Sequence, residues 1–480
     1  MKSLGKNIFY STLLSFFNIV YPLLTASYVS RILGAQNIGI LNYSQSVVNF
    51  LLVFAMLGIS TYGVKEIASV RDNQKEKEKV FSELFFIKFY SSIIVYIFYI
   101  FLIFSYKEFS QNFSIFFIMS FLLLANIFNL DWFFIGIEDY KILSVRNVVT
   151  KILTFLGIIF FVKNKIDINL YTILLVLGQV LGNIWTFIKV RKEINLKFRN
   201  LNYKRHYKPL MVFFFSAFII SIYSMVNGIL VGMFSSAEKV AFFNRARQLQ
   251  MIGITVAGVV INVLIPRVSY YYKNDKEKYY EYLKKSLNFG YIFSIPLAII
   301  LIFLSKEVNI FLGGEEFLQA STSLIILSPL IPIVTVGTWM YLQILVPAGK
   351  EKLGILSQLI MAIISTILNF LLIPKYHDIG AAISITISET IGPIFLYFIL
   401  KRKKMIFLTT NSFYKYFMSG LLMIPVIELS KNTIKNNFKI VTLGTTIATF
   451  IYFIFLLILK EEVTVSVLKK IKEKFYEKIG

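Results

Sequence analysis

The chain has 480 residues, 57% of them hydrophobic and 16% aromatic, and its mean hydropathy is +0.70. A soluble core of this length could not bury so much apolar surface, so the composition excludes a soluble globular protein and predicts a membrane protein. A formal net charge of +24 would suggest a nucleic-acid partner for a soluble protein, but in a membrane protein its meaning depends on where the basic residues lie.

The cysteine and histidine content limits the chemistry. There is no cysteine, and the two histidines, His206 and His377, fall in expected loops. Disulfides, thiol nucleophiles and cysteine-based metal sites are therefore excluded, and no histidine cluster is left to hold a metal. We expect no catalytic residue, no metal and no cofactor.

Fourteen apolar runs are expected to cross a membrane, because about 18 to 25 residues at about 1.5 Å per residue cover a hydrocarbon core of about 30 Å. The first follows the basic start "MKSLGKNIFY" and is longer than a signal-peptide core, so we expect it to be retained. The fifth and the thirteenth are the weakest, and Pro329, Pro332 and Pro347 are expected to bend the tenth and its exit. The runs lie near residues 8–30, 40–62, 83–105, 112–134, 148–162, 170–188, 210–234, 248–265, 286–304, 321–345, 354–373, 380–400, 416–430 and 440–459.

The basic residues indicate how the chain is oriented. With a cytoplasmic N-terminus, the cytoplasmic segments hold about three times as many Lys and Arg residues as the outer loops. We therefore expect a multi-pass protein of the cytoplasmic (inner) membrane with both termini in the cytosol, attracted to anionic membrane lipids and not to nucleic acid. Residues 461–480 are expected to form a basic amphipathic helix at the membrane surface.

An internal duplication is indicated at an offset of 202 residues. This offset aligns "AQNIGILNY" (35–43) with "AEKVAFFNR" (237–245), and "RDNQKEKEK" (71–79) with "KNDKEKYYE" (273–281). Since it spans six predicted runs, an even number, we expect an all-α polytopic membrane protein with two six-helix bundles of like orientation and a cavity between them. The expected parts are residues 1–209, 210–408, two additional helices in 409–460, and the tail. The alternative is a chance match between similar helices and loops.

Two acidic residues are candidates for a coupling-ion or gating site. Glu389 lies near the middle of the twelfth run, where an ionised carboxylate is costly unless it faces water or a partner. Gly392 and Pro393 follow it and weaken the helix. Asp131 lies about one turn inside the fourth run. The alternative is a protonated Glu389 hydrogen-bonded between helices, with Asp131 at the membrane surface.

Basic residues near the ends of the runs are candidates for substrate binding. Arg31, Arg245 and Arg247 lie at outer ends, and guanidinium groups offer paired donors to a pyrophosphate or an acidic sugar. Lys88 and Lys151 lie about one turn inside the cytoplasmic ends of the third and fifth runs. Snorkelling of these side chains to lipid headgroups is the alternative.

Amides inside the runs add two candidates. Asn18 and Asn227 fall in the corresponding first and seventh runs, although amides within a membrane more often join helices than bind sugars. A pairing of Lys88 or Lys151 with Asp131 across neighbouring helices is a further hypothesis. The predicted substrate-binding set is Asn18, Arg31, Lys88, Asn227, Arg245 and Arg247.

Three segments carry a resemblance to a known family: "SRILGAQNIGILNYSQS" (30–46), "YGVKEIASVRD" (62–72) and "WFFIGIEDYKILSVRN" (132–147). With the fourteen runs and the cytoplasmic ends, they resemble the bacterial oligosaccharide flippases, the polysaccharide-transporter branch of the multidrug/oligosaccharidyl-lipid/polysaccharide exporter superfamily. The resemblance covers nearly the whole chain. It implies a V-shaped pair of bundles with a central cationic cavity, which carries an undecaprenyl-pyrophosphate-linked oligosaccharide from the inner to the outer leaflet by alternating access.

The same resemblance implies a transporter and not an enzyme. It implies coupling to an ion gradient, of protons or sodium, or to the membrane potential, and it implies a polysaccharide polymerase and a chain-length regulator as partners in capsule, exopolysaccharide or O-antigen biosynthesis. Arg31 lies inside a family segment, whereas Lys88, Arg245 and Arg247 are placed by topology alone. One alternative is a cation-coupled multidrug exporter of the superfamily, which would favour acidic residues in the cavity. The other is a membrane-embedded polymerase or glycosyltransferase, against which the short outer loops count.

Overall fold

A computed structural model describes residues 4–405, 412–466 and 468–469, and of residues 4–20, 223 and 224 the backbone only. In this part of the chain the regular structure is helical, with no strand. The contacts divide the chain into two compact units, Met1–Ala241 (the first unit) and Phe242–Gly480 (the second unit), which we describe separately. The expected boundary at residue 209 stays a prediction. Most of the expected tail helix lies outside the described residues.

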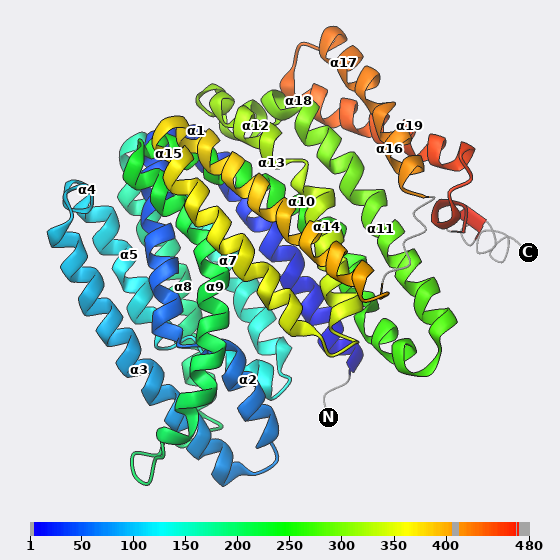
Figure 1. The fold of residues 1–480 in the computed structure, drawn as a ribbon. Coiled ribbons are helices and arrows are strands. Elements are labelled where there is room, and N and C mark those ends of the chain that lie inside the picture. Colours follow the sequence, from blue (N-terminus) through cyan, green and yellow to red (C-terminus); the bar gives the residue numbers. More distant parts are fainter. Residues whose placement is uncertain (1–3, 406–411, 467, 470–480) are drawn as a thin grey trace, which may run out of the picture. The chain divides into compact units, whose positions relative to one another are not determined.

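The first unit consists of long helices joined by short turns. The helix α1 contacts α3, α5, α7 and α9, while α8 packs against α5 and α7 (Figure 1). In chain order the elements are α1 (Leu4–Met56), α2 (Ile59–Ser69), α3 (Gln74–Ser105), α4 (Lys107–Gln111), α5 (Phe113–Asn126), α6 (Asp131–Gly136), α7 (Tyr140–Phe161), the 3-10 turn η1 (Lys165–Asp167), α8 (Ile168–Arg191) and α9 (Lys204–Phe234).

The second unit has the same all-helical character. Its helix α11 packs against α14 and α16, and α15 packs against α13 and α14. The elements are α10 (Ala237–Asn274), whose first turn belongs to the first unit, α11 (Lys276–Phe303), α12 (Ser305–Gly313), η2 (Glu315–Gln319), α13 (Ala320–Leu327), α14 (Leu330–Trp339), the π-helix η3 (Met340–Leu345), α15 (Glu351–Arg402), α16 (Phe413–Leu421), α17 (Met423–Thr433), α18 (Asn437–Lys439), the π-helix η4 (Ile440–Gly444) and α19 (Thr445–Ile458).

The expected polytopic, all-helical fold class is confirmed. Among the described residues, nine helices are long and apolar enough to cross a membrane, or up to eleven if each of two bent helix pairs is one span. Tyr21–Ser69 and Glu351–Arg402 are much longer than one crossing, and each includes parts of two predicted runs. The backbone leaves the helical conformation between those runs, at Gly34 (φ 77°) in α1 and at His377 (φ 54°) in α15.

Of the two weakest predicted runs, the fifth lies within the continuous helix α7, and the thirteenth does not form a single helix. Residues 416–430, the expected thirteenth run, form two short helices, because α16 ends at Leu421 and α17 begins at Met423. Pro425 lies in the first turn of α17, where its missing N–H costs least, whereas in a helix continued from α16 it would have removed a backbone hydrogen bond. The expected bend of the tenth run is present, since the helical segments Glu315–Leu327 and Leu330–Leu345 are bent by 44° at the break that contains Pro329.

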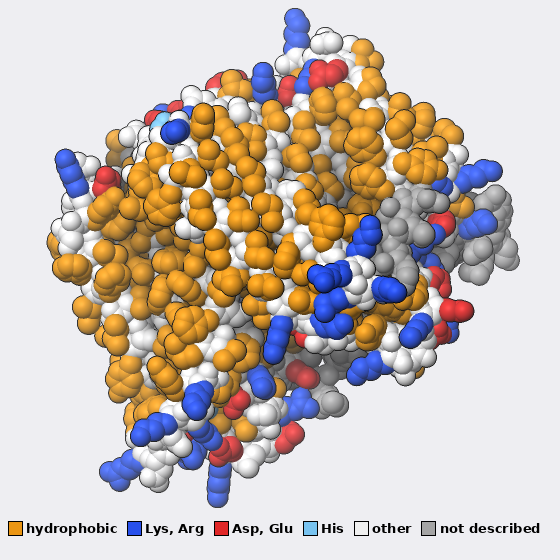
Figure 2. All heavy atoms as spheres, viewed as in Figure 1, with side chains coloured by type: hydrophobic (Ala, Val, Ile, Leu, Met, Phe, Trp, Pro, Cys, Tyr) orange, Lys and Arg blue, Asp and Glu red, His pale blue; other side chains and the backbone are white. Residues whose placement is uncertain are grey.

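One face of α3 is apolar and exposed along most of its length. Large apolar side chains recur along it at helical spacing and stay exposed, while Phe81, Leu84, Tyr99 and Ile103 are buried on the opposite face. Figure 2 shows hydrophobic side chains covering the α3 and α9 region, with Lys and Arg gathered near the start of both helices. A lipid environment explains the exposed face. Its members are Tyr90, Ile94, Ile97, Phe98, Phe101 and Phe104.

The loops at one end of the first unit meet. The Asn37 amide donates to the Lys165 carbonyl at 2.9 Å, and the Tyr43 ring packs edge-on against Phe109 just before α5. Three places therefore lie together: the break in α1 near residue 34, the turn before α5 and the turn after α7. All three follow odd-numbered predicted runs, which the sequence places on one side of the membrane.

At the opposite end the basic loops meet. Gln74 donates to the Glu193 carbonyl at 2.7 Å, and Arg71 forms an ion pair with Glu138 at 3.2 Å. These segments follow even-numbered predicted runs. We call this the basic end of the first unit.

His206 lies at the basic end, but not in a loop as expected. It lies in the first turn of α9, fully buried, with Nδ1 2.8 Å from the Tyr62 hydroxyl and Nε2 2.8 Å from a Glu83 carboxylate oxygen. Glu83 also accepts hydrogen bonds from the Asn202 backbone and from Arg205. This buried carboxylate joins α3 to the start of α9.

Gly39 allows α1 to approach the start of α10 closely, and Gly232 allows a close contact of α9 with α1. A Cβ atom added at Gly39 would stand 1.7 Å from the Ala237 carbonyl oxygen, and one at Gly232 of α9 would meet the Tyr43 ring at 2.4 Å. Only glycine allows backbones this near each other. The contact brings together parts of the two segments that the 202-residue offset aligns.

Candidate functional site

A polar cavity of about 260 Å³ lies inside the first unit, among α1, α5, α7 and α8. Its lining combines two cationic side chains with several amides and hydroxyls, although the surrounding helices have the composition of membrane spans. The lining residues are Tyr21, Gln45, Met119, Leu122, Asn129, Arg146, Asn147, Thr150, Lys151, Thr154, Leu175, Gly178, Gln179, Gly182 and Asn183.

Arg146 is the anchor of this cavity. Its side chain is 7% exposed and binds both carboxylate oxygens of Asp131, one of them at 3.0 Å from Nη2. Nε and Nη2 also donate to the Asn147 side-chain oxygen, at 3.1 and 2.8 Å. A bidentate pair fixes the guanidinium plane as well as its position. The structure gives Asp131 an ion pair with Arg146, and the predicted pairing of Asp131 with Lys88 or Lys151 stays a hypothesis.

Two lysines lie at or directly behind the lining of this cavity. The Lys151 ammonium, one turn after Arg146 and Asn147 on α7, lies over the Tyr21 ring of α1 at 5.5 Å from its centroid. Lys88 of α3 is fully buried and donates to the backbone carbonyl of Asn129, a residue of the cavity lining. Three basic side chains, Arg146, Lys151 and Lys88, therefore lie at or behind the lining, beside the one carboxylate of Asp131.

Glycines on α8 make room for the α7 side chains. A Cβ at Gly178 would stand 2.3 Å from the Thr154 hydroxyl, and one at Gly182 would touch the Arg146 side chain at 3.5 Å. Asn183, one residue further, donates to the Ala125 carbonyl of α5 at 2.9 Å. The α7–α8 interface thus leaves the space that the cavity occupies.

This arrangement suits an anionic, hydroxyl-rich ligand. Ammonium groups and amides donate hydrogen bonds to phosphate and sugar oxygens, and the apolar walls lower the local dielectric constant and strengthen those interactions. The volume lies just below the range of about 300–1,000 Å³ that holds drug-sized molecules. A phosphate group or a single sugar fits it better than a whole oligosaccharide.

The second unit has a separate buried ion pair. Arg247 of α10 lies 2.6 Å from Glu389 of α15, with side-chain exposures of 14% and 8%. Arg247 also donates to the Gln250 side chain at 2.8 Å. The two predicted roles, substrate binding by Arg247 and coupling by Glu389, therefore belong to one pair of residues. Neither role is tested by this geometry, and both stay predictions.

The helix around Glu389 is continuous through the two residues expected to weaken it. Gly392 allows α15 to fold closely on itself, since a Cβ there would meet the Met361 sulfur at 2.2 Å, and Pro393 packs against Gly337 of α14. Arg245, two residues before Arg247, is buried with its guanidinium 4.9 Å from the centre of the Phe317 ring.

The other predicted residues lie apart from the cavity lining. Arg31 is exposed near the break in α1, and Asn227 is fully buried in α9. The side chain of Asn18 lies outside the described part of the chain. Within the described residues there is also no cluster of His, Cys, Asp or Glu that could hold a metal.

Sequence reasoning missed Arg146, the central residue of the cavity. The fifth run was placed from residue 148, which left Arg146 in a loop, whereas α7 already begins at Tyr140. A usable signal was present. Arg146 and Asn147 are the last residues of the segment "WFFIGIEDYKILSVRN", which resembles flippase sequences, and Asp131 directly precedes it.

Comparison with solved structures shows which fold the chain has. The chain is similar to the lipid II flippase MurJ in its inward closed conformation, with a TM-score of 0.74, 20% identity, and coverage of 95% of this chain and 99% of that one. An inward-facing multidrug resistance MATE transporter of the MOP superfamily gives a TM-score of 0.62 at 13% identity, covering 82% and 95%. The fold is therefore that of a polytopic membrane protein of the MOP type.

The sequence comparisons give the family. The model of the polysaccharide biosynthesis protein family matches residues 4–272, and the chain belongs to this family. It is 24% identical to the "Putative O-antigen transporter" of Escherichia coli, over 84% of this chain and 98% of that protein. It is 27% identical to the capsular polysaccharide biosynthesis protein CapF of Staphylococcus aureus, over 55% and 68%. The expected family is confirmed.

Proposed function

We propose that this protein is a flippase that moves lipid-linked oligosaccharides across a membrane for polysaccharide biosynthesis. It acts as a transporter, and no covalent chemistry is assigned to it. The relatives named as an O-antigen transporter and as a glycan biosynthesis flippase agree with this activity, and so does the fold shared with a lipid II flippase.

The observation that carries the proposal is the cationic cavity of the first unit. In a membrane-spanning bundle, charged side chains are costly, and they usually mark the path of a substrate or ion. Arg146 and Lys151 offer donors to a phosphate, and the amides of the lining offer donors and acceptors to sugar hydroxyls. We assign to this cavity the phosphate region of the substrate or the sugar attached to it.

The finer expectations remain part of the proposal. The lipid carrier is undecaprenyl pyrophosphate, the membrane is the cytoplasmic membrane with both chain ends in the cytosol, and the driving force is a proton or sodium gradient or the membrane potential. A polysaccharide polymerase and a chain-length regulator act next in the pathway. Glu389, held by Arg247, is the residue we assign to coupling.

Reconstitution tests the activity directly. The purified protein is placed in liposomes that contain a fluorescent lipid-linked oligosaccharide, and a membrane-impermeant reductant bleaches the outer leaflet. We expect the protein to bring inner-leaflet label to the reductant. Arg146→Gln combined with Asp131→Asn removes the ion pair without leaving one charge alone, and it should slow this transfer about tenfold or more, because charge-assisted hydrogen bonds are lost. Transfer no faster than in protein-free liposomes would contradict the proposed activity.

The same liposomes separate the competing function. A multidrug exporter of this fold would move a cationic dye and leave the lipid-linked oligosaccharide in place. The cationic groups of the cavity oppose such a substrate, since like charges repel each other strongly in a low-dielectric environment.

A further inference from the structure

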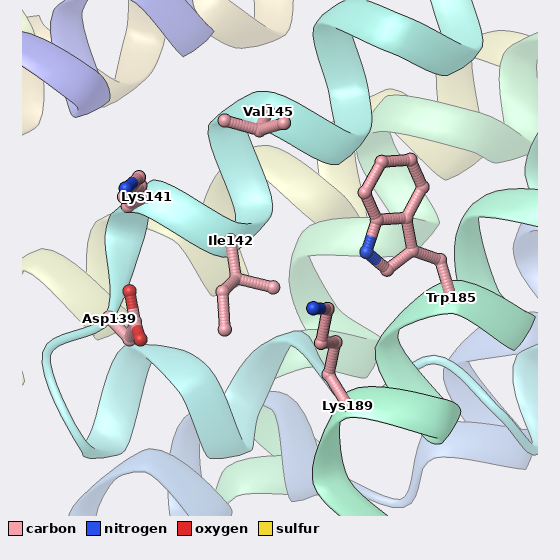
Figure 3. A pocket seen from close by; sticks show the side chains of 6 residues that line it. All are labelled: Asp139, Lys141, Ile142, Val145, Trp185 and Lys189. Carbon is pink, nitrogen blue, oxygen red and sulfur yellow. The ribbon is translucent and has the colours of Figure 1, made fainter.

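A second pocket, of about 440 Å³, opens where α7 begins and α8 ends. Figure 3 shows Trp185 and Lys189 projecting from α8 toward the α7 side chains, and Lys141 close to Asp139 at the start of α7. The lining residues are Asp139, Lys141, Ile142, Val145, Trp185 and Lys189. None of them lines the cavity assigned to the transport substrate.

The residues around the pocket are of the kinds found at the level of lipid headgroups. Along α8, large apolar side chains stay exposed up to Ile184 and Ile188, and Lys189 directly follows them. The start of α7 belongs to the basic end of the first unit, through the ion pair of Glu138 with Arg71. Tryptophan and lysine at the end of a membrane span are typical of the zone between hydrocarbon and water.

The charges of the pocket match one phosphodiester. Lys141 and Lys189 are exposed and stand on different helices, so a phosphate between them could accept hydrogen bonds from both. The buried carboxylate of Asp139 offsets one of the two lysine charges, so the lining has a net charge of one positive unit. The apolar part of the lining, with Ile142, Val145 and the Trp185 ring, offers contacts to the glycerol and acyl part of such a lipid.

We propose that this pocket binds the headgroup of a bilayer phospholipid with one negative charge, such as phosphatidylglycerol, in the leaflet at the basic end. Basic pockets between membrane helices are known binding places for anionic headgroups. The bound lipid would join the first turn of α7 to the last turn of α8, next to the loop that leads to α9. The proposal does not depend on the transported substrate.

Native mass spectrometry of the full-length protein tests this site, with phosphatidylglycerol or phosphatidylcholine as the probe. We expect one phosphatidylglycerol per chain to bind tightly, and phosphatidylcholine to bind much more weakly. Lys141→Gln with Lys189→Gln should weaken the phosphatidylglycerol complex about 30-fold, at the usual contribution of a lysine near an anionic membrane surface. Both lysines are exposed, so the variant should melt like the unmodified protein in the absence of lipid.

A matched control variant distinguishes binding in this pocket from general electrostatic attraction between the basic protein and anionic lipid. Lys403→Gln with Lys404→Gln removes the same charge from the exposed turn that follows α15, and it should leave the complex unchanged. An equal loss in both variants would overturn the proposal, as would equal binding of phosphatidylcholine. Displacement of phosphatidylglycerol by equimolar lipid-linked oligosaccharide would also overturn it, because the pocket would then belong to the transport substrate.

Discussion

The Arg247–Glu389 pair shows what a buried charge requires of its neighbours. Either residue alone would be a poorly solvated ion, and the pair lies at 2.6 Å with little exposure. We expect Glu389→Gln to lower the free energy of unfolding by about 3 kcal/mol, because Arg247 keeps its charge and loses its counter-ion. Thermal unfolding of the purified protein in detergent measures this loss.

The double variant Arg247→Gln with Glu389→Gln is the control for that measurement. It leaves no unpaired charge and should recover most of the lost stability. If the double variant is as unstable as the single one, the pair does not act as an ion pair. For the assigned coupling role, transport by Glu389→Gln should no longer respond to external pH.

Substitution of Lys151 tests whether the positive charge of the first-unit cavity is needed for transport. Its ammonium lies over the Tyr21 ring at the lining, and glutamine removes the charge while keeping a polar end of similar reach. We expect Lys151→Gln to lower oligosaccharide transport about tenfold at normal protein levels. Lys107→Gln changes the same charge at an exposed position outside the cavity and should transport normally. Equal transport by both variants would remove Lys151 from the site.

The residues of the site were only partly predictable from the sequence. Lys88, Lys151 and Asp131 stood out because charges inside apolar runs are rare. Arg146 did not stand out, because it lies just outside the predicted fifth run. A basic residue in that position is assigned to a loop unless the start of the helix is known. The partner of Asp131 depends on how α6 and α7 are oriented, and spacing along the chain does not contain that information.

At the scale of elements, the close contact of α1 with the start of α10 depends on Gly39. A methyl group there would collide with the Ala237 carbonyl, a backbone atom that cannot rotate away. We expect Gly39→Ala to lower the free energy of unfolding by about 1–3 kcal/mol, the usual cost of overpacking. The melting temperature in detergent reports the change.

Gly258 provides the matched control. It lies in the interior of α10, where an added Cβ would meet only an Asn262 nitrogen at 3.9 Å. Gly258→Ala should be neutral or stabilising by up to about 1 kcal/mol, because alanine favours a helix. Equal effects of the two alanine substitutions would mean that the α1–α10 contact is not tight.

Most helices were predictable because hydrophobic length is a strong signal, and the breaks at Gly34 and His377 fall between predicted runs. The break between α16 and α17 was missed. There the apolar pattern continues through Pro425, and the count of apolar residues did not include the hydrogen bond that a proline removes from a helix interior.

For the whole molecule, composition settled the membrane class, and the alternation of basic and non-basic loops predicted which loops share a side. The contacts of the first unit agree with that grouping, since loops after odd-numbered runs meet at one end and loops after even-numbered runs meet at the other. The arrangement of two bundles about a central cavity rests on the duplication and on the family resemblance. It stays a prediction.

The orientation itself can be tested cleanly because the natural chain has no cysteine. Lys75 is exposed at the basic end, at the start of α3, and Lys107 is exposed after the end of the same helix. The excess of Lys and Arg near the first position predicts that it faces the cytosol. A membrane-impermeant thiol reagent should therefore label Lys107→Cys in intact cells and Lys75→Cys only after permeabilisation. The reverse pattern would invert the orientation and place both chain ends outside, whereas labelling of both positions in intact cells would mean that α3 does not cross the membrane.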